Sequence, residues 1–379
     1  MTSKYRAVFA RGGTSKALMF HLADLPADRA QWDALFLSAM GSPDPYGRQL
    51  DGMGGGVSSL SKVCVIGPPS RPDADVDYTF VQVQISEASC DYSGNCGNMS
   101  SAIGPFAIDE GLLQATGEQA TVRVHNTNTG KIINSTFPLK DGRSVEAGEL
   151  VIPGVSGSGA PVRLDFLDPG GASTGKLLPA GQISTVLSVP GVGDVEVSMV
   201  DAANACVFVA ATSLGLRGNE LPAELEENPA VLKQLAAIRE AASVAMGITP
   251  TLEAARAKKL IPFVAFVSGP QDSPSLSGDA IAADSVDLTV RMISNGQPHR
   301  ALPLTGSLCT AVASQLSESV VQRLARPGRS GALRLGMPSG VITVDAEVQR
   351  DANANGGWKA MRGSFFRTTR RLFEGFVYA

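Results

Sequence analysis

The sequence predicts two similar domains, each containing strands and a helix. A chain of 379 residues is too long for one simple hydrophobic core. The segment VDYTFV at 76–81 resembles VDLTVR at 286–291. An equal number of residues separates the first valine of each segment from a predicted helix entrance, which lies at Cys96 in the first half and at Gly306 in the second. This match in spacing and kind favours two copies of one domain over a chance similarity.

The composition is that of a globular chain, with 44% hydrophobic and 18% charged residues. The formal net charge of −4, without a basic block, argues against nucleic acid or an anionic membrane as the partner. The chain has no run of about 18 apolar residues, and its start, MTSKYRAVFARGG, lacks the apolar core of a signal peptide. We therefore expect a cytoplasmic protein. Five cysteines without CxxC spacing and only three histidines predict reduced thiols and no metal site.

The first segment predicts a hairpin, with strands YRAVFA and ALMFH joined by the turn RGGTSK. Arg11 and Lys16 flank the hydroxyl groups of Thr14 and Ser15 in this turn. Two cations and several donors suit a carboxylate, so Arg11, Thr14 and Ser15 are candidate substrate-binding residues. The alternative is a hairpin without a binding role.

A short helix around residues 29–40 precedes a Gly- and Pro-rich segment that cannot form a long regular element. This loop leads Ser58, Ser59 and Lys62 to the entrance of a strand at 63–66. Ser58 and Ser59 are candidate substrate-binding residues, and Lys62 is a candidate base. A lysine pKa of about 10.4 must fall by roughly 3 units for that role. A lone lysine is more often solvated surface.

The stretch DYSGNCGNMSSAIGPFAIDEG at 91–111 is where we expect the chemistry. Its apolar residues recur at helical spacing, which predicts a helix over 97–110 with Gly111 after its end. Cys96 opens this helix, and Asn95 and Asn98 are candidate caps. With Gly97, these asparagines are candidate contacts to a bound anion.

Cys96 is a candidate catalytic thiol, and a small buried hydrophobe is the alternative. A helix start contributes about 2 kcal/mol at most, which lowers a thiol pKa of about 8.5 by roughly 1.5 units. A nearby cation must therefore complete the activation of the thiol.

The segment LTGSLCTAVASQL at 304–316 predicts the corresponding helix of the second half. Thr305, Gly306 and Ser307 form its entrance and are candidate substrate-binding residues, since two helix starts facing one cleft would bind anions. Cys309 falls one turn inside this helix, which indicates a packing position. That position weakens the alternative of a two-cysteine amino-acid epimerase.

Five segments resemble the PrpF family: RGGTSK at 11–16, GSPDPYGRQLDGMGG at 41–55, SSLSK at 58–62, SGNCGN at 93–98 and RTTRRLFEGFV at 367–377. The resemblance spans essentially the whole chain. It implies an α+β fold of the diaminopimelate-epimerase type: two pseudo-symmetric domains, each a sheet wrapped around a central helix, with the active site in the cleft between them. We expect the domains at 1–182 and 183–379, with the last strand free to return to the first domain.

The resemblance also implies an activity. The PrpF family comprises cofactor-free isomerases of unsaturated tricarboxylates, including 2-methylaconitate isomerase and 4-oxalomesaconate tautomerase, also called Δ-isomerase. Its catalytic lysine and cysteine correspond to Lys62 and Cys96, whose separation along the chain also matches that of the family. The expected reaction is a 1,3-allylic proton shift that needs no cofactor and no metal.

Two departures from the family bear on the substrate. The chain has SSLSK at 58–62 and Gly-Gly-Gly-Val at 54–57, which differ from the form associated with methylaconitate enzymes. We therefore favour 4-oxalomesaconate, an intermediate of aromatic-acid catabolism, over 2-methylaconitate of the methylcitrate pathway. A non-catalytic acid-binding partner of a dehydratase is a further alternative. The sequence leaves both a monomer and a homodimer open.

Overall fold

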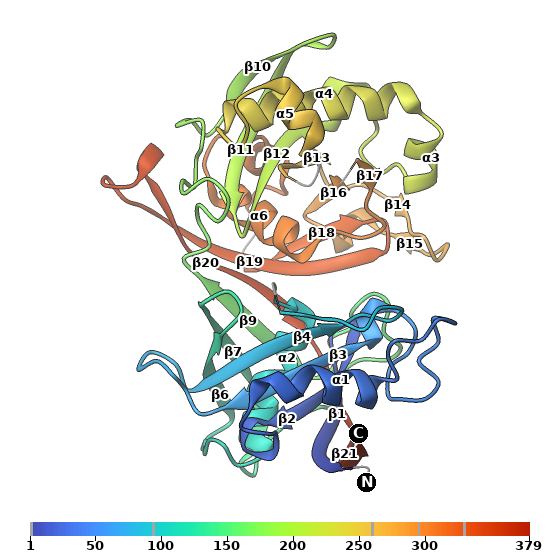
Figure 1. Ribbon diagram of the computed structural model, residues 1–379. Coiled ribbons are helices and arrows are strands. Elements are labelled where there is room, and N and C mark those ends of the chain that lie inside the picture. The colour runs from blue at the N-terminus through green and yellow to red at the C-terminus, as the bar shows by residue number, and fades with distance from the viewer. Residues whose placement is uncertain (1–2, 93–94, 259–260, 295, 329–330) are drawn as a thin grey trace. The chain divides into compact units, whose positions relative to one another are not determined.

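The computed structural model describes residues 3–92, 95–258, 261–294, 296–328 and 331–379 (Figure 1). The chain divides into two compact units. Unit 1 comprises Met1–Phe166 and Phe366–Ala379, and unit 2 comprises Leu167–Phe365. Within the described ranges, no helix is long and apolar enough to cross a membrane.

Unit 1 contains one long series of paired strands. The strands are β1 (Lys4–Gly12), β2 (Ser15–His21), β3 (Lys62–Gly67), β4 (Val76–Val83), β5 (Cys90–Asp91), β6 (Gln119–Asn126), β7 (Lys131–Lys140), β8 (Arg143–Ser144), β9 (Val162–Leu167) and β21 (Thr369–Tyr378). The helices are α1 (Trp32–Met40) and α2 (Gly97–Asp109), with 3-10 turns η1 (Leu22–Asp24), η2 (Arg29–Gln31) and η3 (Ser58–Leu60). The main strands pair in the order β21-β1-β2-β3-β4-β6-β7-β9, in which only β2–β3 and β4–β6 are parallel.

Unit 2 repeats this arrangement. Its strands are β10 (Thr185–Val189), β11 (Gly193–Ala202), β12 (Asn204–Ala210), β13 (Phe263–Ser268), β14 (Ser273–Pro274), β15 (Ala280–Ile281), β16 (Leu288–Ser294), β17 (Gln297–Pro298), β18 (Leu333–Met337), β19 (Gly340–Arg350) and β20 (Trp358–Arg367). Its helices are α3 (Pro222–Glu226), α4 (Pro229–Ala245), α5 (Leu252–Ala257), α6 (Leu304–Gln315) and α7 (Val320–Leu324), with 3-10 turns η4 (Ala211–Leu214), η5 (Ala283–Ser285) and η6 (Asn355–Gly357). The order β10-β11-β12-β13-β16-β18-β19-β20 has its parallel pairs, β12–β13 and β16–β18, at the same places as unit 1.

One ion pair occurs at the same point of both units. In unit 1, Asp75 and Arg123 exchange backbone and side-chain hydrogen bonds just before β4 and β6 align. In unit 2, Asp287 and Arg334 do the same just before β16 and β18 align. The predicted two-domain repeat is therefore confirmed. The offset between the two aspartates is slightly larger than the offset between the two similar sequence segments.

The domain boundary differs from the predicted one. The residues after Phe166 bond to unit 2, because the backbone N–H of Asp168 donates to Met361 and that of Gly171 donates to Asp201. The Asp201 carboxylate also accepts the backbone N–H groups of residues 173 and 174. The last strand, β21, pairs with β1 in unit 1.

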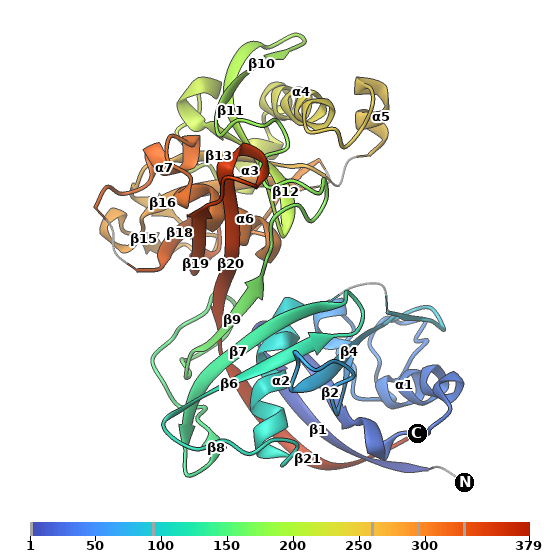
Figure 2. The ribbon, with the colours of Figure 1, turned by 90° about the vertical axis from the view of Figure 1, so that its left-hand side faces the viewer.

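A buried helix runs through each unit. In α2, residues 99–108 are all buried, and in α6 residues 306–314 are all buried. Figure 2 shows α2 between β6 and β7 on one side and β1 and β21 on the other, and α2 packs against all four strands. A Cβ atom at Gly104 would lie 2.6 Å from Ser135 Oγ, so glycine permits the close approach of α2 to β7.

A second helix covers the outer face of the strands in unit 1. Apolar residues of α1, including Trp32 and Phe36, form one cluster with Val63 and Val65 of β3. Because successive strand residues point to opposite faces, Lys62 then faces the inner side that carries α2. This alternation places the candidate base on the face of the sheet that packs against α2.

Candidate active site

The start of α2 offers backbone donors to an anion. Cys96 is the N-cap residue, with φ −106° and ψ 100°, and its carbonyl accepts the backbone N–H of Ser100 at 2.9 Å. Among the described residues, no side chain caps this end. The N–H groups of the first turn are therefore left to a ligand or solvent, and the helix dipole favours negative charge in front of them.

The capping role predicted for two asparagines is wrong, because both side chains have other partners. Oδ1 of Asn95 accepts a 3.2 Å hydrogen bond from Ser100 Oγ. Nδ2 of Asn98 donates to Oγ1 of Thr14 at 3.1 Å. The other two residues at the start of the SGNCGN motif, at 93 and 94, lie outside the described part of the chain.

The β1–β2 hairpin lies against the start of α2. Gly12 pairs with Ser15, so the turn consists of Gly13 and Thr14 alone. A Cβ atom at Gly12 would lie 2.6 Å from a backbone oxygen of α2, which explains the glycine. Ser15 is buried, and its Oγ lies 4.0 Å from Sγ of Cys96. The structure thus brings Thr14 and Ser15 to the candidate thiol.

A cation that the sequence analysis did not assign lies at the same place. Arg367 is 8% exposed, and its Nε donates to Oδ1 of Asn98 at 2.9 Å. Burial lowers the pKa of Arg367 to about 10, and the electrostatic effect of Cys96 opposes this shift. A Cβ atom at Gly13 would lie 2.9 Å from Cδ of Arg367, so the arginine packs directly against the hairpin turn. Its position fits the cation that activation of the thiol requires.

Arg11 has partners within the chain. Its Nη1 donates to the carbonyl oxygens of Gly13 at 2.9 Å and Thr368 at 3.0 Å. Burial lowers the pKa of its guanidinium. Because Gly12 faces α2, the neighbouring Arg11 side chain points to the opposite face of β1. Arg11 therefore ties the hairpin to the final segment, and its binding of a substrate carboxylate stays a prediction.

Lys62 begins β3 and is 7% exposed. Its Nζ donates a short hydrogen bond to Oε1 of Gln82, the residue directly opposite on β4, and lies 5.1 Å from the centre of the Phe80 ring. The expectation of a solvated surface lysine does not apply, because the strand register turns the side chain inward. Ser58 and Ser59 lie in η3, just before β3; Ser58 is exposed and Ser59 is half-buried.

Cys64 links the two candidate proton carriers. It follows Lys62 on the same face of β3 and is fully buried, with Sγ 3.9 Å from the Tyr78 hydroxyl. Burial raises the pKa of this thiol strongly, Cys96 raises it further, and Tyr78 and Lys62 lower it. Lys62 and Cys96 therefore both lie within electrostatic range of one sulfur atom.

The loop before η3 is built around Gln49. This buried side chain donates to Oγ of Ser61 at 2.7 Å and to Oγ of Ser42 at 2.9 Å, and it accepts the backbone N–H of Gly56. A Cβ atom at Gly54 would lie 2.2 Å from Gln49. The glycine-rich sequence thus forms an ordered loop that fixes the entrance of β3.

In unit 2, the N-cap of the helix lies before the predicted entrance at residues 305–307. Pro303 is the N-cap of α6, so it occupies the place that Cys96 has in unit 1. Gly306 and Ser307 are buried within the first turns, where Ser307 Oγ donates to the Pro303 carbonyl, and Thr305 is exposed. The predicted match of Cys96 with Gly306 is therefore wrong by one helical turn.

Cys309 has the packing position that the sequence indicates. It is fully buried, and its thiol donates to the carbonyl of Val200 at 3.3 Å. Because proline has no acid or base group, the residue equivalent to Cys96 in unit 2 cannot carry a proton. The two-cysteine arrangement is absent from the two N-cap positions.

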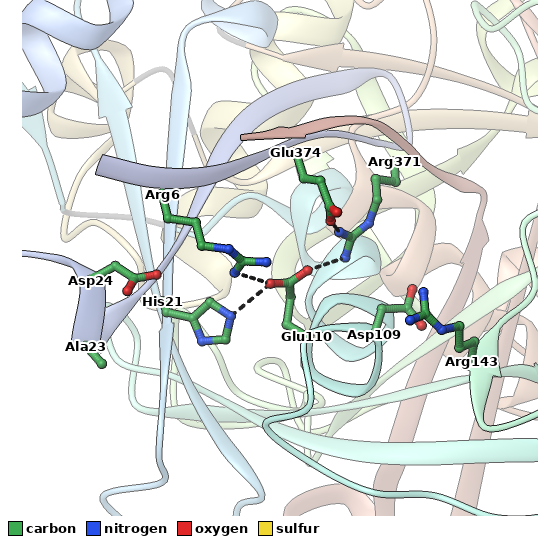
Figure 3. Close-up of a pocket in the computed structure, with 9 residues that line it drawn as sticks. All are labelled: Arg6, His21, Ala23, Asp24, Asp109, Glu110, Arg143, Arg371 and Glu374. Carbon is green, nitrogen blue, oxygen red and sulfur yellow. Dashed lines mark hydrogen bonds and ion pairs between the residues drawn. The ribbon is translucent and has the colours of Figure 1, made fainter. Parts of the chain in front are cut away.

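A polar cavity of about 480 Å³ lies at the other end of α2 (Figure 3). Its central group is Glu110, whose carboxylate receives hydrogen bonds from Arg6 at 2.5 Å and His21 at 3.1 Å and an ion pair from Arg371 at 2.7 Å. Since α2 has 13 residues, this cavity is about 20 Å from Cys96 along the helix. Three of its basic side chains, those of Arg6, His21 and Arg371, are already paired with Glu110, so we assign the cavity a structural role.

Comparison with known proteins shows the family of this chain. The family model described as PrpF protein matches residues 2–379. The chain belongs to the PrpF family. It is 40% identical to 3-methylitaconate isomerase of Eubacterium barkeri over 98% of this chain and 96% of the relative, and 37% identical to 2-methyl-aconitate isomerase of Shewanella oneidensis over 99% and 96%.

Two further similarities extend this result. (4E)-oxalomesaconate Delta-isomerase of Novosphingobium sp. (strain KA1) is 34% identical over 98% of this chain and 96% of its own length. The crystal structure of methylitaconate-delta-isomerase superposes with a TM-score of 0.92 at 40% identity, covering 100% of this chain and 96% of that one. This PrpF protein is therefore an isomerase with the fold predicted from the sequence.

Proposed function

We propose that this PrpF protein catalyses a 1,3-allylic proton shift in an unsaturated di- or tricarboxylate, with Lys62 and Cys96 as its proton carriers. The observation that supports this most is the position of Lys62, which is almost fully buried and faces inward from β3. The strand β3 packs against α2. Lys62 and Cys96 act electrostatically on the same buried Cys64. We propose that both groups face one substrate carbon framework on this side of the sheet.

The proposed reaction starts with Lys62 in its neutral form. Its amine takes a proton from the carbon next to the double bond, and the electron pair left behind delocalises into the conjugated carboxylate. The double bond moves when a proton is delivered to the far carbon of the allyl unit, from Lys62 or Cys96. Protons and electrons balance within the substrate, so the reaction consumes no oxidant or reductant.

Stabilisation of the dienolate comes from donors at the start of α2. The candidates are the N–H groups of its first turn, the guanidinium of Arg367 and the hydroxyls of Thr14 and Ser15. A positioned donor of this kind contributes about 3 kcal/mol to the stability of the transition state.

Three acids of this class are candidate substrates: 4-oxalomesaconate, 3-methylitaconate and 2-methylaconitate. Sequence analysis favours 4-oxalomesaconate, whereas the isomerases named for 3-methylitaconate and 2-methyl-aconitate are slightly more similar to this chain. We keep 4-oxalomesaconate as a proposal and test it beside the other two acids.

The test incubates the purified protein with each acid in heavy water and follows double-bond migration and deuterium incorporation by proton NMR. Turnover of one acid by the protein alone supports the isomerase and removes the non-catalytic partner. Lys62→Met should abolish turnover and retain substrate binding, because methionine has a similar volume but accepts no proton. Lys140→Met, at an exposed strand end, is the matched control and should keep full activity. A fully active Lys62→Met would refute the proposal.

A further inference from the structure

The side chain that contacts Nζ of Lys62 belongs to Gln82. The two residues are direct partners in the antiparallel β3–β4 pair, so their side chains leave the same face of the sheet. Gln82 Oε1 accepts the hydrogen bond from Nζ, and the Phe80 ring covers the ammonium group from the side.

The orientation of the Gln82 amide is fixed by its other contacts. Nε2 donates to the carbonyl oxygens of Ser61 at 2.8 Å and Ser58 at 3.0 Å. Carbonyl oxygens only accept hydrogen bonds, so the NH₂ group must face them and Oε1 must face Lys62. Ser61 is itself held, because its Oγ donates to the Val83 carbonyl at 2.9 Å. The acceptor for Nζ is therefore built into the loop and the strand.

No carboxylate of the described residues contacts Nζ, and Asp91 lies directly opposite Gln82 on β5 with an exposed side chain. Among the described residues, no Asp or Glu forms an ion pair with Lys62. The titratable and charged groups on the packed elements are Cys64 on β3, Asp77 and Tyr78 on β4, Asp91 on β5, Cys96 and Arg367 at the start of α2, and Lys16 and His21 on β2. The last two are engaged with Phe9 and Glu110. Gln82 is thus the polar side chain that directly fixes the amine.

We propose that Gln82 is a positioning residue that holds Lys62 Nζ through a neutral acceptor, so that the lysine stays in place and can still lose its proton. A carboxylate at position 82 would hold the amine equally well but would stabilise the ammonium form. The amide oxygen gives the geometry without that charge. This inference rests on the proposed role of Lys62 as a base.

The deciding variant is Gln82→Glu, measured as kcat/KM and kcat against pH from 6 to 10. An opposite charge at this distance favours the protonated lysine by roughly 1 to 3 pH units. We expect the rising limb of the profile to move to higher pH by that amount. Activity at pH 7 should fall roughly 10-fold to 1000-fold and recover as the pH is raised. Gln119→Glu, on the exposed start of β6, is the control and should leave the profile unchanged.

A second variant tests the positioning independently of charge. Gln82→Asn withdraws the amide oxygen by one methylene, so kcat should fall at every pH while KM and the midpoint of the profile stay near those of the wild type. Thermal melting establishes that each variant is folded, and if Gln82→Glu does not fold, Gln82→Asn alone decides. An unshifted profile in folded Gln82→Glu, or an unchanged kcat in Gln82→Asn, overturns the role of Gln82. If Lys62→Met is inactive and the Gln82 variants behave in either of these ways, only the role of Gln82 is overturned and the proposed function is retained. An active Lys62→Met overturns both the role of Gln82 and the proposed function.

Discussion

Nε of Arg367 lies 2.9 Å from Oδ1 of Asn98, in the first turn of the helix that begins after Cys96. Nδ2 of the same asparagine donates to Thr14, so one amide joins the final segment of unit 1 to the hairpin turn. A buried guanidinium is thereby fixed at the positive end of α2. The helix start alone cannot activate a thiol fully, and in the proposed mechanism Arg367 supplies the further positive charge.

The first prediction concerns the reactivity of Cys96. Arg367→Gln removes the positive charge at the start of α2 but keeps an N–H donor for Asn98, so negative charge developing on the Cys96 sulfur loses a stabilising cation. We expect alkylation of Cys96 by iodoacetamide at pH 7 to slow about 10-fold, measured by mass spectrometry of the Cys96 peptide. Arg367→Lys keeps the charge, so its rate of Cys96 alkylation should lie between those of the wild type and Arg367→Gln.

Arg370→Gln is the control for this experiment, because Arg370 is an exposed residue of β21. The rate of Cys96 alkylation in Arg370→Gln should match that in the wild type. Thermal melting of the Arg367 variants separates a charge effect from a loss of fold. Equal alkylation rates in folded Arg367→Gln and wild type would remove Arg367 from the activation of Cys96.

The second prediction separates the cysteines. Cys96→Ser should lower turnover but keep a measurable rate if Lys62 can carry the proton between the two allylic carbons. Cys309→Ser should be nearly silent, because the serine hydroxyl can make the same hydrogen bond to Val200 and the N-cap of α6 is Pro303. Turnover of the three proteins is compared at equal concentration in heavy water. A Cys309→Ser variant as inactive as Cys96→Ser would restore the two-cysteine mechanism.

Local signals in the sequence were sufficient to predict the helix at Cys96 and the two-domain repeat. The apolar spacing from 97 to 110 agrees with α2 to within one residue, since the buried face of a helix is visible as periodicity. The similarity of 76–81 and 286–291 identifies β4 and the start of β16. These two strands occupy equivalent places in their units, since β4 pairs antiparallel with β3 and parallel with β6, and β16 pairs antiparallel with β13 and parallel with β18. The predicted match of Cys96 with Gly306 was wrong because the connections between strand and helix differ in length in the two units.

Long-range contacts could not be predicted in this way. Arg367 lies near the end of the chain, far from Cys96 in sequence, and only the pairing of β21 with β1 brings it to the hairpin. Arg11 has the composition of a substrate-binding residue, but strand alternation turns it to the other face of β1. Gln82 carries no sequence signal at all, because its role depends on the register between β3 and β4.

The third prediction follows from the revised role of Arg11. Arg11→Ala removes two hydrogen bonds from a charged donor to the carbonyl groups of Gly13 and Thr368. We expect the free energy of unfolding to fall by about 1 to 3 kcal/mol, measured by urea denaturation. The KM of the folded variant should change little. Arg300→Ala, at an exposed position of unit 2, is the control. A KM raised 10-fold with unchanged stability would return Arg11 to substrate binding.

The last prediction uses the charge cluster at the far end of α2 (Figure 3). Burial of the Glu110 carboxylate raises its pKa, but hydrogen bonds from Arg6, Arg371 and His21 outweigh this and lower the pKa of Glu110 to about 2. A carboxylate with a lowered pKa in the folded state stabilises the fold above its unfolded pKa, near 4.5, and loses this effect as the pH falls toward 2. The Glu110 side chain is only 3% exposed, whereas that of Arg6 is 42% exposed, so solvent screens part of the interaction.

Glu110→Gln should therefore lower the free energy of unfolding by about 2 kcal/mol at pH 7, measured by urea denaturation. The difference between variant and wild type should shrink below pH 4.5 and approach zero near pH 2, because protonation of Glu110 makes the two proteins alike in charge. Glu118→Gln, at an exposed position, should show no such pH dependence. A difference that stays constant from pH 7 to pH 3 would contradict the assignment, since it would show that Glu110 stabilises unit 1 by packing rather than by its charge.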